Sequence, residues 1–87
     1  IFREILSNIP ERQKEVLYAI AKDGEARQVT SSAFIKRHRL ASASAVQSAI
    51  KKLLDKDFIT EINKTYSLTD RLFALWIKTV YGTGFRL

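Results

Sequence analysis

The chain has 87 residues, 46% apolar and 10% aromatic, which is enough for one domain with a hydrophobic core and excludes a disordered polymer. Fifteen Lys and Arg against nine Asp and Glu give a net charge of +6, which suits a polyanionic partner but also ordinary surface solubility. The absence of cysteine excludes disulfides, thiolate nucleophiles and thiolate metal sites, and no apolar run approaches the roughly 18 residues that cross a bilayer.

These features predict a soluble cytoplasmic domain that makes no membrane contact. The N-terminus has no signal-peptide layout, and the chain lacks methionine and begins at Ile1. We therefore expect it to be a piece of a longer protein whose activity resides elsewhere.

The first nine residues predict a short amphipathic helix, or a linker helix from an upstream domain, because apolar residues stand at positions 1, 2, 5, 6 and 9. The domain itself is expected over residues 10–87. Pro10 suits a first helical position and Gly24 a helix stop, so the next helix is predicted over residues 10–22. Its apolar stripe consists of Val16, Leu17, Ile20 and Ala21.

A connector follows that allows a small strand at residues 28–29. Thr30 or Ser31 can cap a second helix that runs to about Arg39. Its inner side is expected to consist of Ala33, Phe34 and Ile35. The basic residues of its last turn oppose the negative end of the helix dipole.

Residues 42–56 predict a third helix with one apolar face and one polar face, capped by Ser42 after a turn at Leu40 and Ala41. The apolar face recurs at intervals of three and four residues and consists of Val46, Ala49, Ile50, Leu53 and Leu54. The opposite face consists of Ser44, Ser48, Lys51 and Asp55, flanked by Gln47 and Lys52.

After Asp57 the period changes from helical to alternating, so residues 58–62 and 65–69 predict a β-hairpin with Asn63 and Lys64 at its turn. Asp70 caps a last helix over residues 70–81, ended by Gly82 or Gly84. The predicted fold is mainly α with a small β-hairpin. It is a winged helix-turn-helix with a three-helix core, a wing of two or three strands and an extra C-terminal helix.

No catalytic, cofactor-binding or metal-binding residue is identified, so we expect a non-catalytic chain without a cofactor. His38, the only histidine, has no second ligand at metal spacing and is expected on the surface. The serines have no base or elbow motif around them. The glycines at 82 and 84 follow a helix and precede no lysine, which favours a helix terminus over a phosphate-binding loop.

The polar face of the third helix is a candidate surface for nucleic acid, because the second helix of a helix-turn-helix enters the major groove. The side chains placed for base edges are Ser44, Gln47, Ser48 and Lys51. The candidate phosphate contacts are Ser42, Lys36, Arg37, Arg39 and, at the wing tip, Lys64. The alternative is that this helix face is merely solvated. Two features favour it: Asp55 lies on the same face as Lys51, and the wing tip has a single cation.

The last helix is a second candidate surface. Its apolar stripe consists of Phe73, Trp76, Ile77 and Val80, widened by Leu72, Leu75 and Tyr81. Completion of the core against the first long helix is the favoured explanation. The other is a docking face or homodimer face with Phe73 and Trp76 as anchors.

Several segments are similar to the C-terminal winged helix of archaeal-type AAA ATPases, prokaryotic P-loop proteins whose nucleotide-binding domain lies upstream. The segments are LASASAVQSAIKKLLDK at 40–56, Phe58-Ile59, YSLTD at 66–70 and FALW at 73–76. The resemblance covers about residues 10–80 and implies a regulatory or interaction module beside an ATPase domain of the same chain, with DNA contact possible. No ATP-binding motif is present, so no catalytic residue carries over, and positions 44, 47, 48 and 51 carry over only as candidate contacts. The alternative function is the sequence-specific DNA-binding domain of a transcription regulator.

Overall fold

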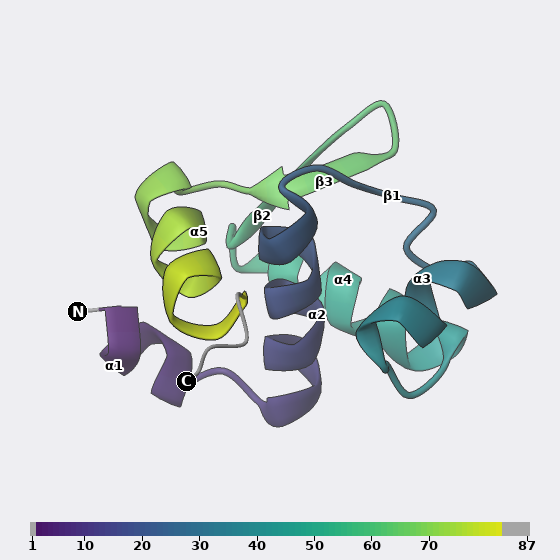
Figure 1. The fold of residues 1–87 in the computed structure, drawn as a ribbon, viewed down its shortest axis with the longest axis horizontal. Helices are drawn as coiled ribbons and strands as arrows, with labels where there is room; N and C mark the ends of the chain where they lie inside the picture. The colour runs from purple at the N-terminus through teal and green to yellow at the C-terminus, as the bar shows by residue number, and fades with distance from the viewer. Residues whose placement is uncertain (1, 83–87) are drawn as a thin grey trace.

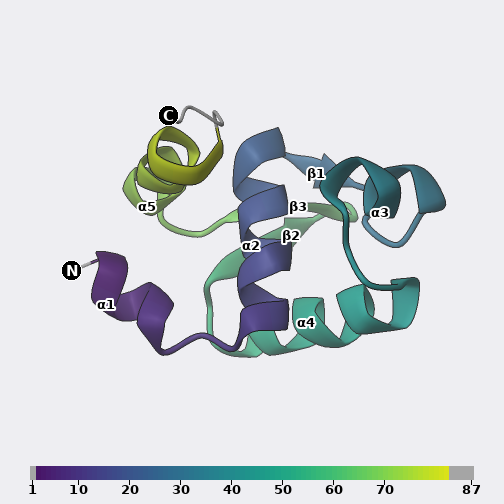
Figure 2. The same ribbon diagram turned by 60° about the horizontal axis from the view of Figure 1, so that its bottom comes forward.

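The computed structural model describes the backbone of residues 2–82 and the side chains of residues 2–80. The helices are arranged around α2, with α1 and α5 on one side of it and α3 and α4 on the other, and the small antiparallel sheet lies at one edge (Figures 1 and 2). The helices are α1 (Phe2–Ser7), α2 (Glu11–Asp23), α3 (Ser32–His38), α4 (Ala43–Asp55) and α5 (Arg71–Ile77), which continues as the π-helix η1 (Lys78–Gly82). The strands are β1 (Ala26–Arg27), β2 (Ile59–Ile62) and β3 (Thr65–Leu68). The predicted fold class, a mainly helical winged helix-turn-helix, is confirmed.

Helix α2 carries the centre of the core because its apolar stripe contacts α4, α5 and β3. Leu17 and Ile20 are fully buried, and Val16 is 2% exposed. Gly24 ends the helix with a φ of 79°, a left-handed conformation that favours glycine. The predicted helix and its stop are therefore present, although Pro10 is the N-cap residue and Glu11 the first helical residue.

Helix α4 is present with the predicted faces. Ser42 caps it, since its Oγ accepts a hydrogen bond from the Ala45 N–H at 3.1 Å. Its buried residues are Val46, Ala49, Ile50 and Leu53, all 5% exposed or less. The next residue, Leu54, is half-buried. Because the apolar side faces α2, the polar side of α4 faces solvent.

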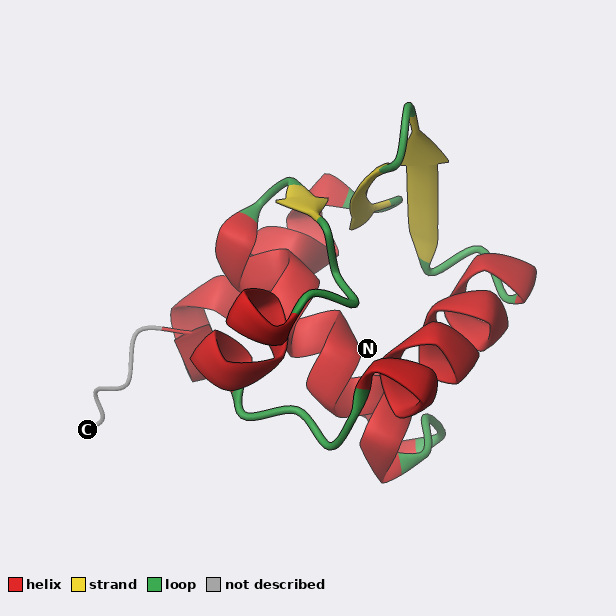
Figure 3. Ribbon diagram, turned by 90° about the vertical axis from the view of Figure 1, so that its right-hand side faces the viewer, coloured by secondary structure: helices red, strands yellow, loops and turns green. Residues whose placement is uncertain are grey.

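The hairpin forms the wing: Ile59 and Leu68 are buried against the helices, and the end of the hairpin with its turn projects away from them (Figure 3). Strand β3 lies in the middle of a sheet of order β1-β3-β2, with Ile59 opposite Leu68 and Glu61 opposite Tyr66. Asn63 and Lys64 form the predicted turn with φ values of 51° and 61°, as hairpins with two-residue turns require.

Three local predictions need correction. The first strand lies at Ala26–Arg27 and not at residues 28–29, because Ala26 is buried opposite Tyr66 while Gln28 has a φ of 49° and leaves the extended region. Ala33 is exposed, so the inner side of α3 is formed by Phe34 with Ile35 half-buried. The side chain of His38 is only 6% exposed, so it is not a surface residue.

The two ends of the described chain pack together. Leu6 and Ile9 are each 4% exposed, and Phe2 is half-buried against α5. The amphipathic helix expected near the N-terminus is therefore present as α1. The predicted last helix is also present, although its final turn is a π-helix that includes Gly82, and Gly84 lies outside the described residues.

Two of the four candidate interface residues of the last helix are core residues, and one of them, Phe73, was an expected anchor. Phe73 is 3% exposed and Ile77 is 1% exposed, which supports the interpretation that the last helix completes the core. Trp76 is half-buried beside Phe2 and Phe73. The exposed apolar residues of this part of the chain are Leu72, Leu75 and Val80. Within residues 2–82, no helix is long and apolar enough to span a bilayer.

Candidate nucleic-acid interface

The polar face of α4 presents the four predicted base-contacting side chains together. Ser44, Gln47, Ser48 and Lys51 are all exposed, opposite the buried side of the helix. They follow one another at intervals of three, one and three residues, so they lie on one strip along the first three turns of the helix. A hydroxyl, an amide and an ammonium group are the kinds of side chain that read base edges in the major groove.

The N-terminus of α4 offers small residues and polar groups. Ala41 and Ala43 are exposed on either side of Ser42, so little side-chain bulk keeps a phosphate backbone away from the helix end. The Oγ of Ser42 lies 3.4 Å from the Oγ of Ser44 and already accepts the capping hydrogen bond from Ala45. The two serine hydroxyls are hydrogen-bonded to each other, so one of the two hydroxyl hydrogens stays available to a phosphate oxygen.

The positive charge of the chain is concentrated in the helix-turn-helix. Residues 26–54 contain six Lys and Arg and no Asp or Glu, while the rest of the chain contains nine of each kind. The whole net charge of +6 therefore arises from this segment. All six cations are exposed: Arg27, Lys36, Arg37, Arg39, Lys51 and Lys52. Only four of these six cations were predicted as nucleic-acid contacts, although the absence of carboxylates from this segment is visible in the sequence.

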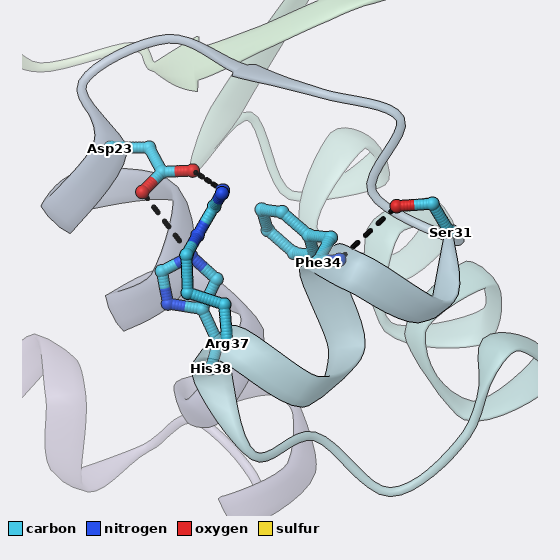
Figure 4. Close-up of polar contacts among 5 residues, drawn as sticks. All are labelled: Asp23, Ser31, Phe34, Arg37 and His38. Carbon is cyan, nitrogen blue, oxygen red and sulfur yellow. Dashed lines mark hydrogen bonds and ion pairs between the residues drawn. The ribbon is translucent and has the colours of Figure 1, made fainter.

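At the end of α3, one of the predicted phosphate contacts is already paired. The Arg37 guanidinium donates to Asp23 Oδ2 at 2.8 Å, across from the C-terminal end of α2 (Figure 4). Lys36 and Arg39 remain exposed, and Arg39 adopts a left-handed conformation with φ 56° as the C-cap of α3. The three cations near this helix end thus have different surroundings.

His38 shares the same carboxylate. Its Nε2 lies 3.2 Å from Asp23 Oδ1 and 3.4 Å from Arg37 Nε, and its ring centroid lies 4.6 Å from that of Phe34. Since Arg37 Nε is a donor only, His38 Nε2 either accepts from it or donates to Asp23. The structure has the first arrangement: the Arg37 Nε–H donates to His38 Nε2, and Asp23 Oδ1 lies close to the same nitrogen. This contact with α2 explains why His38 is buried.

The wing brings further polar groups toward α4. A groove of about 1010 Å³ lies between α4, the β1–α3 connection and the hairpin, and both Gln47 and Lys64 line it. The predicted base contact and the predicted wing-tip cation therefore border one space. Glu25 and Glu61 also line this groove, opposite in charge to Arg27 and Lys64, so the groove itself is not basic.

Tyr66 belongs to the same groove and was not anticipated from the sequence. Burial, the charge of Glu61 and a hydrogen bond to that carboxylate all raise the pKa of the Tyr66 hydroxyl above its ordinary value of 10.0. The two residues lie directly opposite each other on β3 and β2. At neutral pH the tyrosine is therefore a neutral donor that holds Glu61 on the inner face of the wing.

No group of three or more His, Asp or Glu side chains in the described part of the chain lies close enough to hold a metal ion. The interface candidates are consequently the exposed strip of α4, the cations of the helix-turn-helix and the wing tip.

Comparison with known proteins assigns a family. A family model described as a probable winged helix domain matches residues 1–79, which includes α1 and all three strands. None of the curated proteins and none of the solved structures compared with the chain matches it.

Proposed function

The chain belongs to the probable winged helix domain family, and from this premise we propose that it is a non-catalytic module that contacts double-stranded DNA. The observation that carries the proposal is the position of the net charge. All of it arises from residues 26–54, the segment that contains the two helices of the helix-turn-helix. Cations without interspersed carboxylates on one element are the electrostatic footprint of a phosphate-binding surface.

In this proposal the strip of α4 enters the major groove. Gln47 is the residue with the strongest base preference, since a glutamine amide pairs with both the N6 and the N7 of adenine. Lys51 adds a donor that suits guanine. The exposed Lys36, on α3, and Arg39, in the turn between α3 and α4, hold phosphates, and Lys64 holds the backbone from the wing tip.

The test is a fluorescence anisotropy titration of duplex DNA against the domain over a series of salt concentrations. We expect log K to fall with log salt with a slope of about −3 or steeper, because each phosphate contact contributes about −0.9. Lys36→Gln should reduce the steepness by about one contact. Glu11→Gln, at the exposed start of α2, gives the opposite charge change outside the interface and serves as a control. The absence of binding at low salt, or a flat slope, would rule the proposal out.

Sequence preference separates the two biological settings that the sequence allows. In a transcription regulator, one duplex is preferred, and Gln47→Ala removes that preference at a cost of about 1–3 kcal/mol. In a module that assists another domain, binding ignores the sequence and Gln47→Ala has little effect. Both outcomes are read from the same titration with a panel of duplexes.

The second candidate function is regulation of an upstream ATPase domain of the same protein, in the cytoplasm. The observation that favours it is the exposed apolar pair Leu72 and Leu75, 70% and 61% exposed, on the helix against which Phe2 packs. A domain that precedes α1 would join the chain next to Phe2, which packs on the same helix as this pair. The full-length gene should then encode a P-loop domain upstream, and Leu72→Asp should alter its ATP hydrolysis.

Self-association is the competing use of the same pair, and sedimentation of the isolated domain would reveal it. A dimer that Leu72→Asp dissociates would support a homodimer through the C-terminal helix. A gene without an upstream P-loop sequence would remove the ATPase proposal altogether.

A further inference from the structure

Asp23 lies outside the basic helix-turn-helix but forms an ion pair with one of its cations. It belongs to the last turn of α2, outside the carboxylate-free segment, yet its side chain reaches across to α3 (Figure 4). Among the described residues, it is the one carboxylate within ion-pair distance of a cation of residues 26–54. The carboxylate thus occupies a cation that would otherwise be available to a phosphate.

The surroundings make this pair more than a typical surface ion pair. The Asp23 side chain is 21% exposed, its Oδ2 accepts a hydrogen bond from Arg37 at 2.8 Å, and its Oδ1 lies 3.2 Å from His38 Nε2. The His38 side chain is 6% exposed and packs against the carboxylate. The Arg37 guanidinium lies 5.7 Å from the centre of the Phe34 ring. Partly buried, charge-assisted hydrogen bonds are stronger and less screened by salt than exposed ones.

Arg37 nevertheless remains accessible, with a side chain that is 60% exposed. A phosphate can therefore approach its outer donors, but it would then meet the negative charge of Asp23 on the other side of the same guanidinium. Like charges this close repel each other. The phosphate has to displace the carboxylate or share the cation with it, and either event weakens binding.

We propose that Asp23 competes with DNA phosphate for Arg37. In the free protein Asp23 holds the Arg37 guanidinium, and this pairing limits the affinity for DNA. The inference rests on the proposed function. It adds that DNA binding and the ion pair between α2 and α3 weaken each other. By linkage, a bound duplex weakens the Asp23–Arg37 pair as much as that pair weakens binding.

The first test compares Asp23→Asn with the wild-type domain in the salt-dependent titration. Asn keeps the size of the side chain and removes the charge. We expect the affinity to rise about three- to tenfold, and the salt slope to become steeper by about 0.9, as one more phosphate contact requires. In the Arg37→Gln background the same change should have little effect, because the cation that it frees is absent.

Glu4→Gln is the matched control, since it adds the same charge on α1, on the opposite side of α2 from α3 (Figure 1). Equal effects of Asp23→Asn and Glu4→Gln would overturn the inference and leave only a general charge effect. Weaker binding by Asp23→Asn would also overturn it, because Asp23 would then position the interface. Failure of the wild-type domain to bind DNA would instead reject the proposed function.

A second measurement needs no variant and guards against a substitution that unfolds the domain. In NMR spectra of the wild-type protein, the Asp23 carboxyl carbon and the Arg37 Nε–H report on their pair. We expect both signals to shift as duplex is added, in step with the binding curve. Signals that stay unchanged at saturation would overturn the inference, since the pair would then be intact in the complex.

Discussion

The ring of Phe2 stacks on the ring of Phe73, with 5.0 Å between the centroids and 29° between the planes. Phe2 comes from the first helix and Phe73 from the last, so this contact joins the two ends of the described chain. Trp76 extends the cluster, at 5.5 Å from Phe2. The three rings hold α1 against α5 on the side of α2 that faces away from α3 and α4 (Figure 2).

The aromatic contact should contribute measurably to stability. Phe2→Ala is expected to lower the free energy of unfolding by about 1–3 kcal/mol, because it removes a half-buried ring and a stacking partner. Equilibrium urea unfolding of the domain measures this change. The control is Leu72→Ala, at a side chain that is 70% exposed, where we expect a change within about 0.5 kcal/mol. Equal losses in the two variants would contradict the role assigned to Phe2.

The start of α5 depends on one cap. Asp70 Oδ1 accepts hydrogen bonds from the N–H groups of Leu72 at 2.9 Å and Phe73 at 3.2 Å. Asp70→Ala is expected to lower the free energy of unfolding by about 1 kcal/mol, whereas Asp70→Asn should retain most of the stability because asparagine also caps helices. Thermal unfolding of the two variants makes the comparison. If asparagine proves as harmful as alanine, the effect does not come from capping.

The wing tip should show opposite effects on stability and on DNA binding. Lys64 has a φ of 61°, which glycine adopts at little cost, so Lys64→Gly is expected to raise the stability by up to about 1 kcal/mol. If Lys64 contacts a phosphate as proposed, the same change should also reduce the steepness of the salt slope by about 0.9. Urea unfolding and anisotropy titration of one protein sample give both values.

Asn63→Gly is the control for the wing tip, because it changes the same turn and keeps the charge. Asn63 also has a positive φ, of 51°, but asparagine tolerates this conformation better than lysine. We therefore expect a smaller gain in stability and an unchanged salt slope. A slope that falls equally in both variants would show that the shape of the turn, and not the cation, contributes to binding.

Stability should fall in alkaline solution partly through Tyr66. Burial and Glu61 raise the pKa of its hydroxyl in the folded state above 10.0, so the unfolded chain loses this proton first as the pH rises. The stability that the neutral hydroxyl provides is complete below the unfolded pKa and is lost as the pH passes through the folded pKa. Urea unfolding between about pH 9 and 11 should therefore show a smaller decline for Tyr66→Phe than for the wild-type domain. Parallel declines would exclude this contribution.

The elements that local sequence determines were predicted well. Helix α4 follows from the spacing of Val46, Ile50 and Leu53 and from the cap at Ser42, all within one segment. The hairpin follows from the two turn residues between alternating runs. Each of these signals lies within about fifteen residues, so no knowledge of distant contacts is needed.

The features that depend on distant partners were missed. Strand β1 has two residues, and its position is fixed by pairing with Tyr66, forty positions later in the chain. His38 was expected on the surface because nothing in its own segment indicates that Asp23 of α2 would cover it. The burial of Phe73 was predicted as the favoured of two explanations and is confirmed, although the helix pattern does not say which neighbour covers the stripe.

The concentration of charge in residues 26–54 has a consequence for the approach to a polyanion. Cations on α3, α4 and β1 beside an electrically balanced remainder make the molecule a permanent dipole, with its positive end at the helix-turn-helix. In the field of a distant phosphate chain, such a molecule experiences a torque as well as an attraction. The molecule would reach the polyanion with its helix-turn-helix, including α4, turned toward the phosphates. The orientation is therefore selected before the first hydrogen bond forms.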